Sequence, residues 1–164
     1  MTFKNITIIL CTYNEENYIK NSINLLQQNI DDLELIVVDD NSSDKTRDII
    51  YELNNHKKIK LIHRKKSRGL ASAFLTGLIE SNGGRIGWID TNMSELTLKF
   101  KEMNNALDEG YDIAFLSRYV EGGEDQRKLF RSLCSKYFNT VCRILLGSKI
   151  KDYTSGIFLM KRKV

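Results

Sequence analysis

The chain has 164 residues, with 25 Lys and Arg against 21 Asp and Glu, so its formal net charge is +4 at pH 7. This length predicts a single domain over 1–164, and the apolar runs are too short to cross a bilayer, so we expect a soluble or at most peripheral protein. Its three cysteines form no Cys-x-x-Cys pair and its two histidines complete no zinc pattern, which favours a reduced, cytoplasmic location.

Short apolar runs rich in β-branched residues alternate with segments whose apolar residues recur at helical spacing. This alternation is typical of an α/β domain with a mostly parallel central sheet flanked by helices. The clearest helical periods are at 19–30, 46–53 and 96–107. In chain order, the expected strands are 5–11, 34–39, 59–63, 85–90, 112–117 and 156–161.

Helix boundaries can also be predicted from local residue types. Asp44 is placed to cap the second helix. The third helix should end at Gly83–Gly84 and the fourth at Gly110, because glycine readily adopts the backbone conformation that ends a helix.

The longest predicted helix, 127–146, carries an apolar stripe beside a basic face. The segment 127–164 has ten Lys and Arg against one acid, which gives it a charge of +9 and leaves −5 for the rest. Two interpretations stay open. The helix packs on the sheet with its basic face in water, or it lies at a membrane surface near anionic lipid headgroups.

Polar segments follow the expected strands at the positions where a parallel sheet binds ligands. Ligands bind at the carboxyl ends of such strands, because loops and helix N-termini converge there. After the first five strands and before the last, the segments are TYNEE (12–16), DDNSSDKT (39–46), RKKSRG (64–69), DTN (90–92), SRY (117–119) and DYTSG (152–156).

These segments supply what a nucleoside diphosphate needs, which is a ring to stack on a base, a carboxylate and positive charge. Tyr13, Asp40, and Arg68 or Arg118 could fill these parts. Taken singly, each has an ordinary structural alternative, such as packing, turn formation or a surface ion pair. The dinucleotide glycine fingerprint and the Walker A loop are both missing, which argues against NAD and against ATP held by a P-loop.

The order of these segments resembles the family 2 glycosyltransferases, which have a GT-A fold. The resemblance is strongest to the dolichyl-phosphate mannosyltransferase-like branch, which glycosylates polyprenyl phosphates. It implies a Rossmann-like GT-A domain that lacks the family's C-terminal portion. The matching segments are TYNEE at 12–16, VVDDNSSDKT at 37–46, RGLASAFLTGL at 68–78, IDTNMS at 89–94, SRYVEGG at 117–123 and DYTSGIFLMKR at 152–162.

The resemblance implies a role for each matching residue. The nucleotide pocket would be lined by Thr12, Tyr13, Asn14 and Glu15. The base or ribose would be held by Asp40, with Asp39 behind it, and the diphosphate would face Arg68 and Gly69. The acceptor side would be closed by Asp152, Thr154 and Ser155. The catalytic set would be Asp90, Asp152 and the two arginines that meet the phosphates, Arg118 and Arg131.

A divalent metal, Mg²⁺ or Mn²⁺, is the implied cofactor, because it can stabilise the charge of the leaving nucleoside diphosphate. Asp90 would be its first ligand. The family has Asp-x-Asp at this point, whereas this chain has Asn92, whose amide oxygen carries no formal charge and ligates a hard cation more weakly. Ser94 would be a weak third ligand through a water molecule.

The implied reaction is inverting transfer of a hexose from a nucleotide sugar of the GDP-mannose or UDP-glucose type to a polyprenyl phosphate. A phosphate monoester has a second pKa of about 6 and is mostly a dianion at neutral pH, so it can attack without a general base. The basic 127–147 helix would give a peripheral membrane contact. We expect no nucleic-acid partner.

Two other interpretations are consistent with parts of the sequence. Asn92 and the short C-terminus are consistent with a catalytically weakened relative that still binds nucleotides. The spacing from Asp39–Asp40 to Asp90, with Ser117 after the next strand, also resembles a receiver-like signalling domain phosphorylated at Asp90. Receivers begin at their acidic strand, however, whereas here a full strand and helix precede it.

Overall fold

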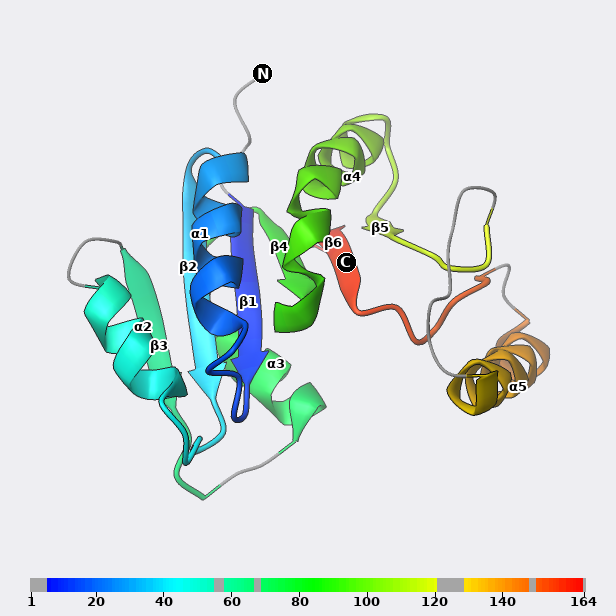
Figure 1. The fold of residues 1–164 in the computed structure, drawn as a ribbon. Coiled ribbons are helices and arrows are strands. Elements are labelled where there is room, and N and C mark those ends of the chain that lie inside the picture. The colour runs from blue at the N-terminus through cyan, green and yellow to red at the C-terminus, as the bar shows by residue number, and fades with distance from the viewer. Residues whose placement is uncertain (1–5, 55–57, 67–68, 121–128, 148–149, 164) are drawn as a thin grey trace. The chain divides into compact units, whose positions relative to one another are not determined.

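The computed structural model describes residues 6–54, 58–66, 69–120, 129–147 and 150–163 (Figure 1). Its strands form one sheet with the order β3-β2-β1-β4-β6-β5. The strands are β1 (Ile6–Thr12), β2 (Leu33–Asp39), β3 (Ile59–His63), β4 (Arg85–Ile89), β5 (Ile113–Phe115) and β6 (Ile157–Lys161). The helices are α1 (Ile19–Asn29), α2 (Thr46–Asn54), α3 (Leu70–Ile79), the 3₁₀ helix η1 (Thr91–Leu98), α4 (Lys99–Asp108) and α5 (Leu129–Leu146).

The chain divides into two compact units. The first, here called the sheet unit, comprises Met1–Ala114 and Ile157–Val164, and the second comprises Phe115–Gly156. In the sheet unit, α1, α2 and α4 cover one face of the sheet and α3 lies against the other (Figure 1). Apolar residues alternate along β1 between these two faces, so Ile8 lies toward α4 and Ile9 toward α3.

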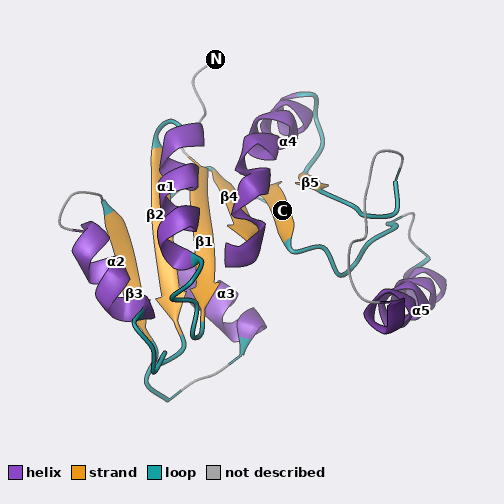
Figure 2. Cartoon of the chain, in the orientation of Figure 1, coloured by secondary structure: helices purple, strands orange, loops and turns teal. Residues whose placement is uncertain are grey.

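The strand register brings the ends of three parallel strands into line. β1 pairs in parallel with β2 and β2 with β3, so that Thr12 lies opposite Asp39 and Asp39 opposite His63. β4 also runs parallel to β1, whereas β6 is antiparallel to β4. The residues that follow β1, β2, β3 and β4 therefore emerge at one edge of the sheet, where Figure 2 shows the loops after β1 and β2 side by side.

The predicted α/β architecture is confirmed, with three differences in the elements. The expected strand 112–117 is shorter, since β5 comprises Ile113–Phe115. The expected helix 96–107 is preceded by a 3₁₀ segment, η1, which runs directly into α4. Such tighter turns are common at helix N-termini. The third helix ends at Ile79, before the predicted Gly83–Gly84. The fourth ends as predicted, because Gly110 follows the C-cap residue Glu109 with a left-handed backbone (φ 112°).

Helix α5 begins at Leu129, and the first two residues of the predicted helix, 127 and 128, lie outside the described residues. Many apolar side chains of α5 are exposed among the described residues. The exposed apolar side chains of α5 are Leu129, Phe130, Leu133, Tyr137, Phe138, Ile144, Leu145 and Leu146. In the described part of the chain, no helix is both long enough and apolar enough to cross a membrane.

Close packing of α3 on the sheet gives a first testable prediction. A Cβ atom added at Gly77 would lie 2.5 Å from Cγ2 of the buried Ile9. Alanine gains about 0.8–1.0 kcal/mol of helix propensity over glycine, but overpacking costs about 1–3 kcal/mol. Three carbons of Ile9 would lie within 3.3 Å of the new Cβ, which places the cost toward the upper end of this range. We therefore expect Gly77→Ala to lower the free energy of unfolding by about 1–2 kcal/mol in urea titrations.

The matched control is Gly84→Ala, because no heavy atom lies within 4 Å of a Cβ built at Gly84. This substitution should change the stability by less than about 0.5 kcal/mol. A Gly77→Ala protein as stable as the parent would show that α3 does not pack this closely.

Candidate functional site

A pocket of about 320 Å³ opens where β1, β2 and β4 end and α3 begins. Its lining combines apolar side chains with carboxylates. The lining residues are Cys11, Thr12, Tyr13, Glu15, Asp40, Gly69, Leu70, Ala73 and Asp90. Six of these nine were predicted from the sequence as nucleotide or metal ligands, and the fold brings them together.

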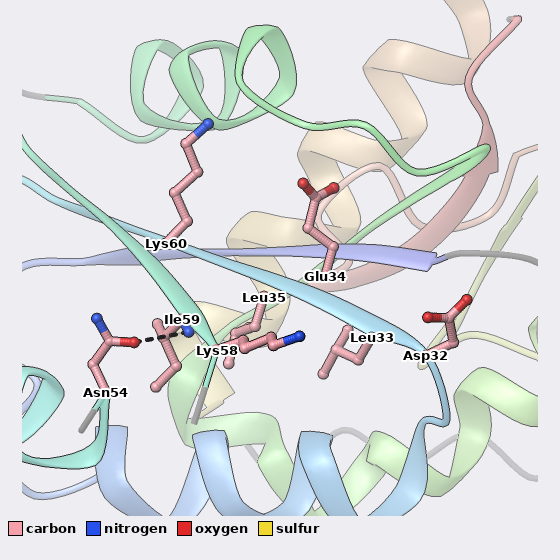
Figure 3. Close-up of a pocket in the computed structure, with 8 residues that line it drawn as sticks. All are labelled: Asp32, Leu33, Glu34, Leu35, Asn54, Lys58, Ile59 and Lys60. Atoms are coloured by element: carbon pink, nitrogen blue, oxygen red, sulfur yellow. Dashed lines mark hydrogen bonds between the residues drawn. The ribbon is translucent and has the colours of Figure 1, made fainter. Parts of the chain in front are cut away.

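A larger hollow of about 420 Å³ lies at the opposite, amino end of β2 and β3 (Figure 3). Two of its four charged side chains, Lys60 and Glu34, already serve the fold. The Lys60 ammonium donates to Glu80 Oε2 at 2.7 Å, and the Glu34 carboxylate accepts hydrogen bonds from the backbone of Asn82 and Gly83. Asn54 Oδ1 accepts from the backbone N–H of Ile59. We therefore place the candidate site at the carboxyl end of the sheet.

Three hydrogen bonds hold the Asp40 carboxylate in the pocket. Its two oxygens accept from Arg64 Nε at 2.6 Å and Arg64 Nη2 at 2.8 Å, and Oδ2 also accepts from the Gly69 backbone N–H at 2.9 Å. Hydrogen bonding to this carboxylate raises the pKa of the Arg64 guanidinium. Sequence reasoning missed Arg64 as the partner, although the register predicts it, since Asp39 lies opposite His63 and the next residues follow side by side.

Asp39 lies behind Asp40, as predicted, and is fully buried. Its carboxylate accepts from Thr12 Oγ1 at 3.1 Å, from the Ser42 backbone N–H at 3.0 Å and from the Ser42 hydroxyl. Arg47 Nε lies 3.8 Å from Asp39 Oδ1. Asp39 thus fixes the loop after β2, so it would act on a ligand through that loop.

The β1–α1 loop is docked on the β2–α2 loop. Asn14 has a left-handed backbone (φ 57°), and its side-chain oxygen accepts from the Ser43 backbone N–H at 2.8 Å. Asn14 is not among the residues that line the pocket, and its amide satisfies a backbone group of the neighbouring loop, so its role toward a nucleotide stays a prediction. Asp44 Oδ1 accepts from the N–H of Thr46, the first residue of α2, which confirms its expected place at the helix start.

Glu15 links two of the predicted segments. The Thr91 hydroxyl donates to Glu15 Oε2 at 2.8 Å, and Thr91 follows Asp90 directly. This hydrogen bond connects the TYNEE segment to the DTN segment at the pocket wall. The sequence could not indicate this contact, because it joins residues 76 positions apart.

Asp90 occupies the N-cap position of η1 with an extended backbone and lines the pocket. Asn92 is exposed in the turn that follows. Ser94 is buried, and its hydroxyl accepts from Asn21 Nδ2 at 3.3 Å, so a role for it as a water-mediated ligand stays a prediction. Within the described ranges, no cluster of three or more His, Cys, Asp or Glu side chains could hold a metal ion.

Cys11 forms part of the pocket wall and gives a second prediction. Burial, together with the charges of Asp40 and Asp90, raises the pKa of its thiol to about 12. Because the thiolate is the reactive form, Cys11 should react with iodoacetamide at pH 8 at least about 100-fold more slowly than an ordinary exposed cysteine. Cys134, which is exposed, should be modified first, as measured by peptide mass spectrometry over time.

The control for this experiment is the same reaction in urea, where Cys11 and Cys134 should react at similar rates. Equal rates in the folded protein would show that the Cys11 thiol is not held in this buried, acidic environment.

The Phe115–Gly156 unit contains a second polar cluster. Arg118 donates from Nε to Asp152 Oδ2 and from Nη2 to Asp152 Oδ1, both at 2.9 Å, and Nη2 also donates to Thr154 Oγ1 at 2.7 Å. Burial tends to raise the pKa of the Asp152 carboxyl, but hydrogen bonds from Arg118 and Thr154 lower it to about 2. Three of the predicted residues are therefore in contact.

Three predicted site residues remain, namely Arg68, Arg131 and Ser155. Arg68 lies outside the described residues, as does the side chain of Arg131, whose backbone belongs to α5. Ser155 follows Thr154 and is half-buried.

A model of the family described as glycosyl transferase family 2 matches residues 7–164. The chain belongs to this family. The receiver-like interpretation is thereby excluded, and the predicted family is confirmed.

Two curated relatives are similar to this chain over nearly all of its length. The chain is 33% identical to a dolichol-phosphate mannosyltransferase of Pyrococcus furiosus, over 97% of this chain and 47% of that protein. It is 32% identical to a polyprenol monophosphomannose synthase of Mycolicibacterium smegmatis, over 96% of this chain and 62% of that protein. The chain therefore spans about half the length of the curated relatives that it matches.

A solved structure shows the same fold. A mannosyltransferase from Pyrobaculum calidifontis in complex with GDP-mannose and Mn²⁺ superimposes with a TM-score of 0.65 at 18% identity, over 97% of this chain and 45% of that one. The predicted GT-A fold is thus confirmed.

Proposed function

We propose that this chain is a glycosyltransferase that moves a hexose from a nucleotide sugar to a polyprenyl phosphate with inversion. The observation that carries the proposal is the pocket itself, which places Asp40, Asp90 and the start of α3 around one cavity at the carboxyl end of the sheet. The two curated relatives are by name a dolichol-phosphate mannosyltransferase and a polyprenol monophosphomannose synthase, which supports a polyprenyl phosphate acceptor and transfer of mannose. The mannosyltransferase structure with GDP-mannose supports that nucleotide sugar as the donor.

The nucleotide has suitable groups along this pocket. The apolar side chains of Cys11, Leu70 and Ala73 offer a surface for a base, and the ring of Tyr13 is half-exposed beside them. Gly69 and Leu70, at the start of α3, line the pocket, and among the described residues no side chain caps this helix start. Its backbone N–H groups and dipole would therefore suit a diphosphate.

A divalent cation would be held by Asp90, with the amide oxygen of Asn92 as a weaker second ligand. When bound, Mg²⁺ or Mn²⁺ would offset the charge on the leaving nucleoside diphosphate. The donor set is compatible with a hard cation, since both groups offer oxygen, but it carries a single formal charge. The mannosyltransferase structure that shares this fold contains Mn²⁺ with its GDP-mannose.

This donor set gives a third prediction, for Asn92→Asp. A second carboxylate beside Asp90 should tighten Mn²⁺ binding in the presence of GDP by about tenfold, because ligand charge largely determines affinity for hard cations. Titration of Mn²⁺ followed by its paramagnetic resonance signal measures this change. Glu95→Gln is the control, because Glu95 is exposed and lies outside the pocket lining. An unchanged Mn²⁺ affinity in Asn92→Asp would remove this position from the metal site.

The acceptor phosphate would attack the anomeric carbon directly. An oxygen of the phosphate dianion forms the new bond while the bond from that carbon to the nucleoside diphosphate breaks, so no proton has to be transferred. The two anions repel each other, and Arg118 and Arg131 would offset this repulsion. Asp152 would hold Arg118 in place, with Thr154 and Ser155 on the acceptor side.

Contact with the membrane surface would bring the chain to such a lipid. The exposed apolar side chains of α5 and the +9 charge of 127–164 both favour peripheral binding to anionic bilayers at the cytoplasmic face.

A second function has support from the metal ligands. With Asn92 in place of an acid, a relative that binds nucleotides but transfers sugar poorly is the alternative.

The test is incubation with radiolabelled GDP-mannose or UDP-glucose, polyprenyl phosphate and Mn²⁺, followed by extraction of the lipid. We expect labelled lipid with GDP-mannose, and less of it when EDTA replaces Mn²⁺. Nucleotide binding without labelled lipid under either donor would favour the weakened relative. A protein that shows no nucleotide binding and no labelled lipid would contradict the proposal.

A further inference from the structure

Arg64 joins the pocket carboxylate Asp40 to the first turn of α3. Besides its two hydrogen bonds to Asp40, its guanidinium donates from Nη1 to Ser72 Oγ at 3.0 Å and from Nη2 to the Gly69 carbonyl at 3.2 Å. Gly69 in turn donates its N–H to Asp40. Residues that follow β2, follow β3 and precede α3 thus form a closed ring of hydrogen bonds.

Gly69 takes part in this ring with a backbone that other residues rarely adopt (φ 123°, ψ 135°). Its carbonyl also accepts from Ala73 N–H, the first hydrogen bond of α3. The direction in which α3 starts is therefore set at Gly69, which Arg64 and Asp40 hold from two sides.

The ion pair is buried, with 8% of the Arg64 side chain and 10% of the Asp40 side chain exposed. A buried ion pair adds little stability compared with apolar residues of the same volume, because both charges lose their hydration. The Arg64–Asp40 ion pair instead fixes the position of the carboxylate. The planar guanidinium fixes both carboxylate oxygens at once, which an ammonium group cannot do.

We propose that Arg64 is a positioning residue for the nucleotide. It fixes the Asp40 carboxylate and the start of α3 in the arrangement that binds the nucleotide, and it is not itself among the residues that line the pocket. This inference rests on the proposed nucleotide site.

The variants that test it are Arg64→Lys, which keeps the charge but loses the planar fork, and Arg64→Met, which loses both. We expect the Kd for GDP to rise at least about fivefold in Arg64→Lys and at least about tenfold in Arg64→Met, and the Kd for GMP to rise by similar factors. A loss confined to GDP would indicate direct contact with the terminal phosphate and would overturn the positioning role.

The matched control is Arg85, a second buried arginine of the sheet unit. Arg85 is the first residue of β4 and is not among the residues that line the pocket. Its guanidinium pairs with Asp108 at 2.6 Å and donates to the backbone carbonyl of Asn104, both in α4. Arg85→Lys should lower the melting temperature but leave the Kd for GDP within about twofold of the parent.

Three outcomes distinguish a failure of the positioning role of Arg64 from a failure of the proposed function. If the parent binds GDP and Arg64→Lys binds it within twofold of the parent, the positioning role is wrong even if Arg64→Met does not fold. If Arg85→Lys weakens GDP binding as much as Arg64→Lys does, the effect is general destabilisation and the positioning role is again wrong. If the parent binds none of GDP, UDP and CDP, the proposed function itself fails.

Discussion

Asp90→Ala is expected to lower the rate of sugar transfer by about 10²–10³-fold, which corresponds to about 3–4 kcal/mol of transition-state stabilisation. Asp90 is the carboxylate that follows β4 in the pocket, and without it only the neutral oxygen of Asn92 would remain of the two proposed cation ligands. The leaving nucleoside diphosphate would then develop its charge without a bound cation. Initial rates of labelled lipid formation at saturating GDP-mannose measure this loss.

Circular dichroism and a thermal melt of the variant, compared with the parent, check that it stays folded. Asp112→Ala is the matched control, since Asp112 is exposed and lies outside the pocket, 3.5 Å from Lys161 Nζ. It should retain the parent rate within about twofold. Full transfer by Asp90→Ala would contradict the assignment of Asp90 as a metal ligand.

Asp152→Asn is expected to lower the free energy of unfolding by about 3–5 kcal/mol, because it leaves the Arg118 guanidinium without its charged partner. The Asp152 carboxylate is fully buried and accepts hydrogen bonds from the backbone and side chains of Arg118 and Thr154. An amide in its place turns an N–H₂ group toward one of these donors. Urea titration followed by circular dichroism measures the change.

Acid provides an independent readout of the same pair. The pKa of Asp152 is lowered from 3.8 to about 2 in the folded protein, so its ionised form contributes stability that is present above pH 3.8 and is lost as the pH falls toward 2. Asp152→Asn should lose less stability than the parent between these pH values. The control is Glu102→Gln, because Glu102 and Lys99 form an exposed pair that should contribute less than about 0.5 kcal/mol. An Asp152→Asn protein as stable as the parent would contradict the account of this cluster.

The sequence was most informative where the fold follows from local pattern. Apolar runs predicted the strands closely, since β3 lies at Ile59–His63 as expected. The rule that ligands bind at the carboxyl ends of parallel strands then predicted that Asp40 and Asp90 share one edge of the sheet, and both line the pocket.

Contacts that depend on tertiary geometry could not be predicted in the same way. Asn14 was expected in the pocket, but the loop after β2 needed a partner for the Ser43 N–H, and Asn14 supplies it. In the DTN segment only Asp90 and Asn92 were predicted to have a role, yet the hydroxyl of Thr91 between them donates to Glu15. Arg64 was one of several basic residues in RKKSRG, and only the strand register singles it out as the partner of Asp40.

The measurement that tests the central claim most directly is calorimetric titration of GDP into the parent protein and into Asp40→Asn, with Mn²⁺ present. Arg64 Nε and the Gly69 backbone N–H both donate to Asp40, so the carboxylate is fixed before any ligand arrives. We predict binding at one site in the parent and at least about tenfold weaker binding in Asp40→Asn, since hydrogen bonds to a charged group contribute about 1.5–3 kcal/mol. Equal affinity in the two proteins would contradict the assignment of this pocket to the nucleotide.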